Sequence, residues 1–142
     1  LTAARALAHR HEVVAEFHQC HPAELAFIRA DQIDLAVAVT SLSFEADLDR
    51  VLRQVHRVVR HGGHFLITVP HAAHLCADPT DRSRTIRAWT DPDPVDDRHV
   101  HRAEDLVGAL VRANFAVDTL MELHDGALVP ATLLVRARRL GV

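Results

Sequence analysis

Residues 33–70 constrain the fold more than any other part of the chain, because they combine two strand patterns with a helix pattern between them. Ile33–Val39 is a short, nearly continuous apolar run, which is typical of a strand covered on both faces. From Ala46 the apolar residues recur at helical spacing, and they form one stripe made of Leu48, Val51, Leu52, Val55, Val58 and Val59. Residues 64–69 then predict a second buried strand, which Pro70 ends because proline lacks a backbone donor.

The predicted helix has signals at both ends. Acidic residues open it and arginines close it, which matches the helix dipole. We expect Gly62-Gly63 to stop it, because glycine adopts the left-handed conformation of helix ends without a steric penalty. Two buried strands joined by a helix predict a parallel pair with a right-handed crossover. Ligands bind beyond the carboxyl ends of such strands, so we expect the functional site at residues 40–43 and 71–74.

Composition predicts a single globular domain over residues 1–142, with 49% hydrophobic and 25% charged residues. The net charge of −3, with acids and bases interspersed, argues against a nucleic-acid partner. No apolar run approaches the ~20 residues of a membrane span and no signal peptide is visible, so we expect a cytoplasmic protein without a membrane partner. All sixteen basic residues are arginine, a bias typical of GC-rich bacterial genomes. The chain begins at Leu1 in helix-like sequence, so we expect residues of the natural protein upstream.

Outside the central segment the patterns are shorter. They predict a helix over residues 1–9, a strand over 13–18, a helix over 103–113 and two strands over 115–122 and 131–138, the last pair antiparallel. No standard N-cap residue marks the start of the 103–113 helix. Residues 76–98 lack periodicity, and a connection of that length is usually a functional lid or a disordered segment, which Trp89 could anchor.

The order of these elements resembles the C-terminal two-thirds of a class I S-adenosylmethionine-dependent methyltransferase, of the branch called methyltransferase type 11. Asp34-Leu35-Ala36-Val37 is similar to the family's fourth strand, and residues 47–52 (DLDRVL) are similar to the helix that follows it. Residues 57–63 (RVVRHGG) resemble its R-V-L-K/R-P-G-G segment, with His61 where proline is usual. Residues 113–115 (ANF), followed by Glu122, resemble its A-G-F…E segment.

The resemblance implies an α/β fold, a Rossmann-like sheet that is mostly parallel with its last strand antiparallel, truncated at the N-terminus. The family's glycine-rich turn, which holds the methionine part of the cofactor, has no counterpart here, since no GxG occurs in the sequence. The acid that ends the family's second strand and binds the ribose is also absent. Matched to the family, the chain would begin in the helix after the second strand. Two alternatives follow: residues are missing upstream, or the chain is a remnant that does not bind the cofactor normally.

The resemblance also implies a cofactor site on two segments. His21, Pro22 and Ala23 stand where the family has the loop that contacts adenine, with His21 in place of the usual acid. The alternative is a surface loop that Pro22 shapes. Thr40, Ser41 and Leu42 follow the fourth strand of the family and would border the cofactor, or they only begin a turn.

His71 is the candidate catalytic residue. It follows the second strand of the 33–70 unit, on the acceptor side of the family's pocket, and histidine suits a general base near neutral pH. The alternative is an exposed histidine in a chain with twelve of them. A zinc hypothesis on residues 71–76 and 99–101 is weaker, because HxxH lacks the glutamate of HExxH, and we predict no metal site.

The leading hypothesis is therefore transfer of a methyl group from S-adenosylmethionine to a small-molecule O, N or C acceptor. The alternative is a non-catalytic, truncated methyltransferase-like domain that pairs with another chain. A sheet edge left by missing strands favours such pairing, and a homo-oligomer could form through it.

Overall fold

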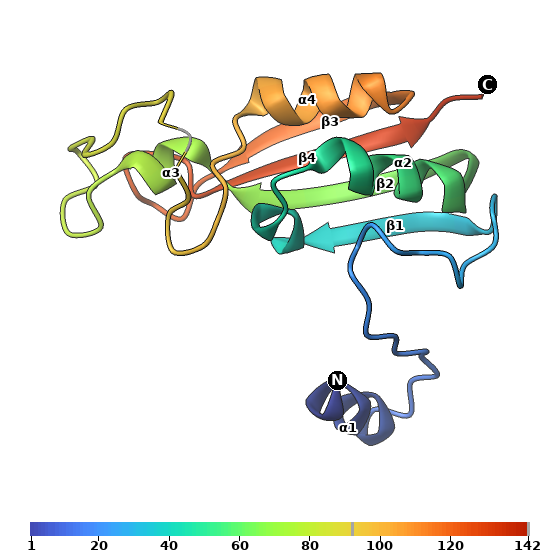
Figure 1. Cartoon of the computed structure of the whole chain (residues 1–142). Coiled ribbons are helices and arrows are strands. Elements are labelled where there is room, and N and C mark those ends of the chain that lie inside the picture. The colour runs from blue at the N-terminus through green and yellow to red at the C-terminus, as the bar shows by residue number, and fades with distance from the viewer. Residues whose placement is uncertain (92, 142) are drawn as a thin grey trace.

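The computed structural model describes residues 1–91 and 93–141, and it contains one mixed four-stranded sheet with two helices packed on one of its faces (Figure 1). The strand order is β1-β2-β4-β3. The elements are α1 (Thr2–Arg10), β1 (Ile33–Val39), the 3-10 helix η1 (Ser41–Phe44), α2 (Leu48–Val58), β2 (Val59–Pro70), α3 (Ala72–Cys76), α4 (Ala103–Arg112), β3 (Phe115–Leu123) and β4 (Thr132–Arg139). In this part of the chain no helix is long and apolar enough to cross a membrane.

The predicted strand–helix–strand unit is confirmed. β1 and β2 are parallel, with Val37 opposite Leu66 in the register. The side chain of Asp47 caps α2 by accepting a hydrogen bond of 3.0 Å from the Arg50 N–H. The apolar stripe of α2 is buried against the sheet, and Leu52 has no exposed surface.

The expected end of the helix at Gly62-Gly63 is wrong. α2 ends at Val58, and Val59 is already the first residue of β2, with no exposed surface. The two glycines lie in an irregularity of the β1–β2 pair, where β2 advances from Val59 to His64 while β1 advances only from Ile33 to Leu35. Gly62 has a φ of +74°, and a Cβ on Gly63 would lie 2.9 Å from the Asp34 carbonyl oxygen. Burying Val59 in the sheet therefore overrides helix propensity, and the glycines permit the bulge that follows.

The C-terminal half confirms the predicted helix and two strands. β4 lies between β2 and β3 and is antiparallel to both, so the antiparallel last pair is also confirmed. Asp105 marks the start of α4, because its carboxylate accepts the Arg102 backbone N–H at 3.2 Å and the Arg102 guanidinium at 2.9 Å. Arginine is not a standard N-cap residue, so the carboxylate of Asp105, three residues later, binds Arg102 and fixes the start of the helix.

The core lies between the sheet and the α2–α4 layer, and its largest fully buried side chains include Phe65, Phe115, Leu52, Ile67, Leu106 and Leu110. The other face of the sheet carries no helix in Figure 1. On β1, Leu35, Val37 and Val39 are 52%, 54% and 66% exposed. The prediction that β1 is covered on both faces is therefore confirmed for one face and wrong for the other.

The predicted strand over residues 13–18 is wrong, because these residues form no regular secondary structure. The side chain of Val14 is fully exposed, and the sheet formed by the described residues offers this segment no neighbour. An extended segment without a strand partner cannot satisfy its backbone groups in a ladder. The helix predicted over residues 1–9 is confirmed as α1, which lies away from the sheet with no buried residue (Figure 1).

The connection from α3 to α4 confirms the aperiodic segment predicted from the sequence. It contains two isolated bridges, Ala77 with Thr85 and Val95 with Arg98, so its described part is folded rather than disordered. Trp89 is 46% exposed and does not anchor it in the core, contrary to the expectation. Pro92, which was part of the predicted lid, lies outside the described residues.

Candidate functional site

The carboxyl ends of β1 and β2 meet at one edge of the sheet, where the sequence predicts function (Figure 1). The chain leaves β1 at Thr40, whose N–H donates to the Thr68 carbonyl oxygen at 2.8 Å. Thr40 has a φ of +55°, and this left-handed turn leads directly into η1. Ser41 lies at the surface, whereas Leu42 is only 2% exposed.

The loop that contains His21, Pro22 and Ala23 packs against this turn. His21 Nε2 lies 3.3 Å from the Glu45 carboxylate, and Ala23 is buried in the same apolar cluster as Leu42. The Ala23 N–H donates to His21 Nδ1 at 3.1 Å, so in the neutral ring Nε2 carries the proton that faces Glu45. The structure therefore brings the two predicted cofactor-binding segments together.

The sequence pattern predicts no separate role for His101, yet in the structure its side chain holds this turn in place. Its Nε2 lies 3.1 Å from the Leu42 carbonyl oxygen and 3.0 Å from that of Glu45, and carbonyl oxygens can only accept, so Nε2 donates. Burial lowers the pKa of His101, which favours the neutral ring. Ser43 beside it is fully buried, and its Oγ has no hydrogen-bond partner among residues 1–91 and 93–141.

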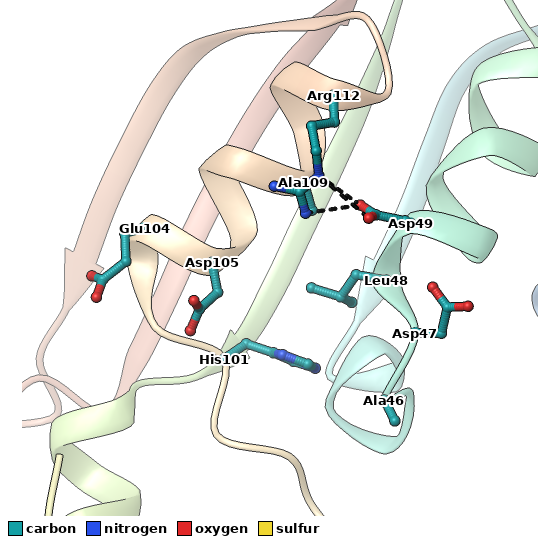
Figure 2. A pocket seen from close by; sticks show the side chains of 9 residues that line it. All are labelled: Ala46, Asp47, Leu48, Asp49, His101, Glu104, Asp105, Ala109 and Arg112. Atoms are coloured by element: carbon teal, nitrogen blue, oxygen red, sulfur yellow. Dashed lines mark hydrogen bonds and ion pairs between the residues drawn. The ribbon is translucent and has the colours of Figure 1, made fainter. Parts of the chain in front are cut away.

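A hollow of about 350 Å³ opens beside His101, between the N-terminal ends of α2 and α4 (Figure 2). Figure 2 shows His101 pointing from the segment before α4 toward the turn that precedes α2. The carboxylates around it already have partners: Asp47 caps α2, Asp49 lies 2.9 Å from Arg112, and Asp105 binds Arg102. In the described ranges no three His, Cys, Asp or Glu side chains are placed to hold a metal ion.

His71 follows β2 directly at the same edge of the sheet, and it is 8% exposed. Its Nδ1 accepts the Ala73 N–H at 3.1 Å, which caps α3, and its Nε2 lies 3.2 Å from Glu122 at the end of β3. Because Nδ1 accepts a backbone N–H, the neutral ring carries its proton on Nε2 and donates it to Glu122. Both ring nitrogens are therefore engaged, and His71 must release one contact before it can accept a proton.

Glu122 was named from the sequence only as the end of the segment that resembles A-G-F…E. It lies in β3, and its half-exposed carboxylate faces His71 from 51 residues away in the chain. No local pattern could signal this pair, because β4 is inserted between β2 and β3 only in the folded sheet.

The comparisons with known proteins agree with this architecture. Residues 1–67 match the model of a methyltransferase domain, while no curated protein matches the sequence. An S-adenosylmethionine-dependent methyltransferase from Mesorhizobium loti superposes with a TM-score of 0.74 at 21% identity, over 95% of this chain and 76% of that chain. A second one, from Clostridium acetobutylicum, gives a TM-score of 0.75 at 11% identity, over 99% and 71%. The cyclase SpnF gives 0.73 at 16% identity, over 99% and 62%, so the same fold also occurs in a protein named for another reaction.

Proposed function

We propose that this chain takes part in methyl transfer from S-adenosylmethionine to a small-molecule acceptor. Its residues 1–67 match a methyltransferase domain model, and its fold is that of S-adenosylmethionine-dependent methyltransferases. One observation carries the proposal: the His21–Ala23 loop packs against the turn at the carboxyl end of β1. This is the edge of a parallel sheet at which such folds bind ligands.

The residues present fit one end of the cofactor. The loop of His21, Pro22 and Ala23 would lie against an adenine, with His21 Nε2 available to it once the contact to Glu45 opens, and Thr40, Ser41 and Leu42 form the facing turn. The methionine end requires a close backbone approach that glycine permits, and no glycine precedes Gly62 in this chain. The described residues therefore do not supply that end, and we derive no step through the cofactor.

On the acceptor side, we propose His71 as the proton acceptor and Glu122 as the group that orients it. A hydroxyl acceptor must lose a proton when its oxygen is methylated, and a histidine held by a carboxylate is suited to that role. The hydrogen bond from Ala73 must open first, because it occupies the only nitrogen of the neutral ring that can accept. Positioning of the acceptor supplies the rest of the rate enhancement.

The test is a calorimetric titration of the purified 142-residue chain with S-adenosylhomocysteine. Saturable one-to-one binding is expected, and His21→Ala should weaken it about tenfold, which corresponds to about 1.4 kcal/mol. His18→Ala is the matched control, because His18 is a half-exposed histidine three residues earlier that faces Glu16. If the chain is folded but does not bind S-adenosylhomocysteine, the proposal that this chain alone transfers methyl groups is wrong.

The second candidate is a non-catalytic domain that pairs with a second copy through β1. The Gln32 N–H donates to the Val58 carbonyl oxygen at the end of α2, at 2.9 Å, and the Thr40 N–H donates to the Thr68 carbonyl oxygen of β2, at 2.8 Å. Backbone groups alternate along a strand, so those of Leu35, Val37 and Val39 face the outer edge, where the described sheet has no further strand. An unpaired edge with apolar side chains favours strand pairing between chains.

Sedimentation velocity over a range of protein concentrations tests this pairing. We expect a dimer that Val37→Lys disrupts, because a lysine on an edge strand opposes pairing. Val111→Lys is the control, since Val111 is similarly exposed but lies on α4. A monomer at every concentration, or an equal effect of both substitutions, would contradict the second candidate.

A further inference from the structure

The segment between α3 and α4 encloses a second hollow, of about 320 Å³, which lies outside the site described above. The segment that lines it lies with α3 beyond the carboxyl end of β2 (Figure 1). Three arginines line it, Arg82, Arg87 and Arg98, together with His74 from α3. Among the described residues that line it, Asp96 is the one acid.

The remaining wall of this hollow is apolar. Leu75 from α3 and Ile86 and Val95 from the loop line it. The backbone is held in shape, because Ile86 N–H donates to the Cys76 carbonyl at 3.0 Å and Val95 is bridged to Arg98. A concave surface with apolar walls and a few polar groups is the usual form of a small-molecule site.

Acids are frequent in this loop, and two of them, Asp78 and Asp81, bind the turns in which they lie. Asp78 Oδ1 accepts the Thr80 N–H and hydroxyl at 2.8 and 2.7 Å, which lowers the pKa of Asp78. Asp81 Oδ1 accepts from the backbone and hydroxyl of Ser83 in the same way. These carboxylates are therefore held by local hydrogen bonds to turn residues.

The cationic groups are used in part. Arg82 donates to the His74 carbonyl oxygen at 2.9 Å. Arg87 lies 2.9 Å from Asp91 and donates to the Asp93 and Pro94 carbonyl oxygens, while its buried Nε has no partner among the described residues. His74 Nδ1 is likewise buried without a partner in the described chain. Both atoms belong to residues that line the hollow, and buried polar atoms without a partner are costly.

The charges around His74 agree with this geometry. Its pKa is lowered by burial first, and then by the nearby guanidinium groups of Arg82 and Arg98, while Asp125 acts in the opposite direction. A positive environment that disfavours a charged histidine is one that favours a bound anion.

We propose that this hollow binds the oxyanion of a small organic acid, a carboxylate or a phosphate ester, with the organic part against Leu75, Ile86 and Val95. Arg82, Arg87 and Arg98 would donate to the oxyanion, since guanidinium groups match carboxylate and phosphate oxygens. If the proposed methyl transfer holds, this anion is part of the acceptor, because α3 contributes His74 and Leu75 to the hollow and His71 is the N-cap residue of α3. That assignment rests on the proposed function, whereas anion binding itself does not.

The test is a titration of the full chain with hexanoate, hexyl phosphate and 1-hexanol, followed by NMR of the arginine Nε–H signals, without any cofactor. We expect saturable shifts of the Arg87 and Arg98 signals with at least one anion and none with the neutral alcohol. The anion that binds more tightly identifies the oxyanion that the site takes. Arg98→Gln should weaken binding about tenfold, because a charge-assisted hydrogen bond is lost.

Arg84→Gln is the matched control, since Arg84 is an exposed arginine of the same loop that does not line the hollow. Equal shifts with 1-hexanol, no shifts with either anion, or equal weakening by both substitutions would overturn the proposal. Failure of S-adenosylhomocysteine to bind would not affect this result, so the two proposals are tested separately.

Discussion

At the residue scale, buried histidines make the stability of this fold depend on pH. The pKa of His101 is lowered by burial, and the pKa of His56 is lowered by burial and by Arg139. A histidine with a lowered pKa favours the folded state only while it is neutral, above its ordinary pKa of 6.5. The free energy of unfolding should therefore be highest above pH 6.5. As the pH falls below that value, the unfolded chain binds protons more readily than the folded protein does, so the free energy of unfolding decreases.

We expect the free energy of unfolding, measured by urea denaturation, to decrease as the pH is lowered from about 7.5 to about 5.5. In His101→Gln this decrease should be shallower, because one of the titrating groups is gone while an amide N–H still serves the two carbonyls. The pKa values of Asp105 and Asp118 are lowered too, but they titrate below this window. Identical slopes for both proteins would show that His101 does not contribute.

Arg139 gives a second prediction at this scale. It is 8% exposed, and its guanidinium donates to the Asp31 carboxylate, the Val59 carbonyl oxygen and His56 Nε2. Arg139→Met should cost roughly 2 kcal/mol more than Arg138→Met, because Arg138 is an exposed neighbour on the same strand. Chemical denaturation of the two variants measures the difference, and equal losses would mean that the buried network contributes nothing.

At the scale of elements, two glycines have opposite roles. A Cβ on Gly63 would lie within 3 Å of the Val59 side chain and of two backbone carbonyl oxygens, those of Arg60 and Asp34. Gly108 lies inside α4, where a Cβ would meet only the flexible end of Arg112 at 3.3 Å. The bulge between β1 and β2 therefore needs its glycine, whereas the helix does not.

Gly63→Ala should destabilise the protein by roughly 1–3 kcal/mol, because backbone atoms must shift to admit the methyl group. Gly108→Ala should stabilise it by about 0.5–1 kcal/mol through helix propensity. Thermal unfolding of both variants measures these shifts. Destabilisation by both, or by neither, would contradict this account of the bulge.

At the scale of the whole molecule, the sheet is supported unevenly. β2 and β4 are bonded on both sides and buried beneath α2 and α4, whereas β1 has one neighbour and an exposed apolar face. Residues 1–32 add α1, which buries none of its side chains. The molecule is therefore well packed at its centre and weakly held at its N-terminal side.

Native-state hydrogen exchange should reveal this gradient. We expect the amides of β2 and β4 to exchange slowest, through global unfolding, and those of α1 and residues 13–18 to exchange fastest. β1 should be intermediate, because its hydrogen bonds open at a sheet edge. A β1 as protected as β2 would instead indicate that the edge is covered, as the second candidate function requires.

The elements that depend on local patterns could be predicted from the sequence alone. The apolar run of β1, the helical stripe of α2 and the strand before Pro70 are each encoded in neighbouring residues, so they could be predicted with their order. The order of the elements supports the resemblance to methyltransferases. It also predicts the edge of the sheet at which a site is expected.

Which of these residues contact one another depends on the folded protein. The strand predicted over residues 13–18 does not form, because a strand needs a partner strand and partner strands lie far away in the sequence. The end of α2 moved because burying Val59 outweighed a glycine signal. The His71–Glu122 pair, the His101 bonds to η1 and the arginine-lined hollow all join distant segments, and local periodicity carries no information about such contacts.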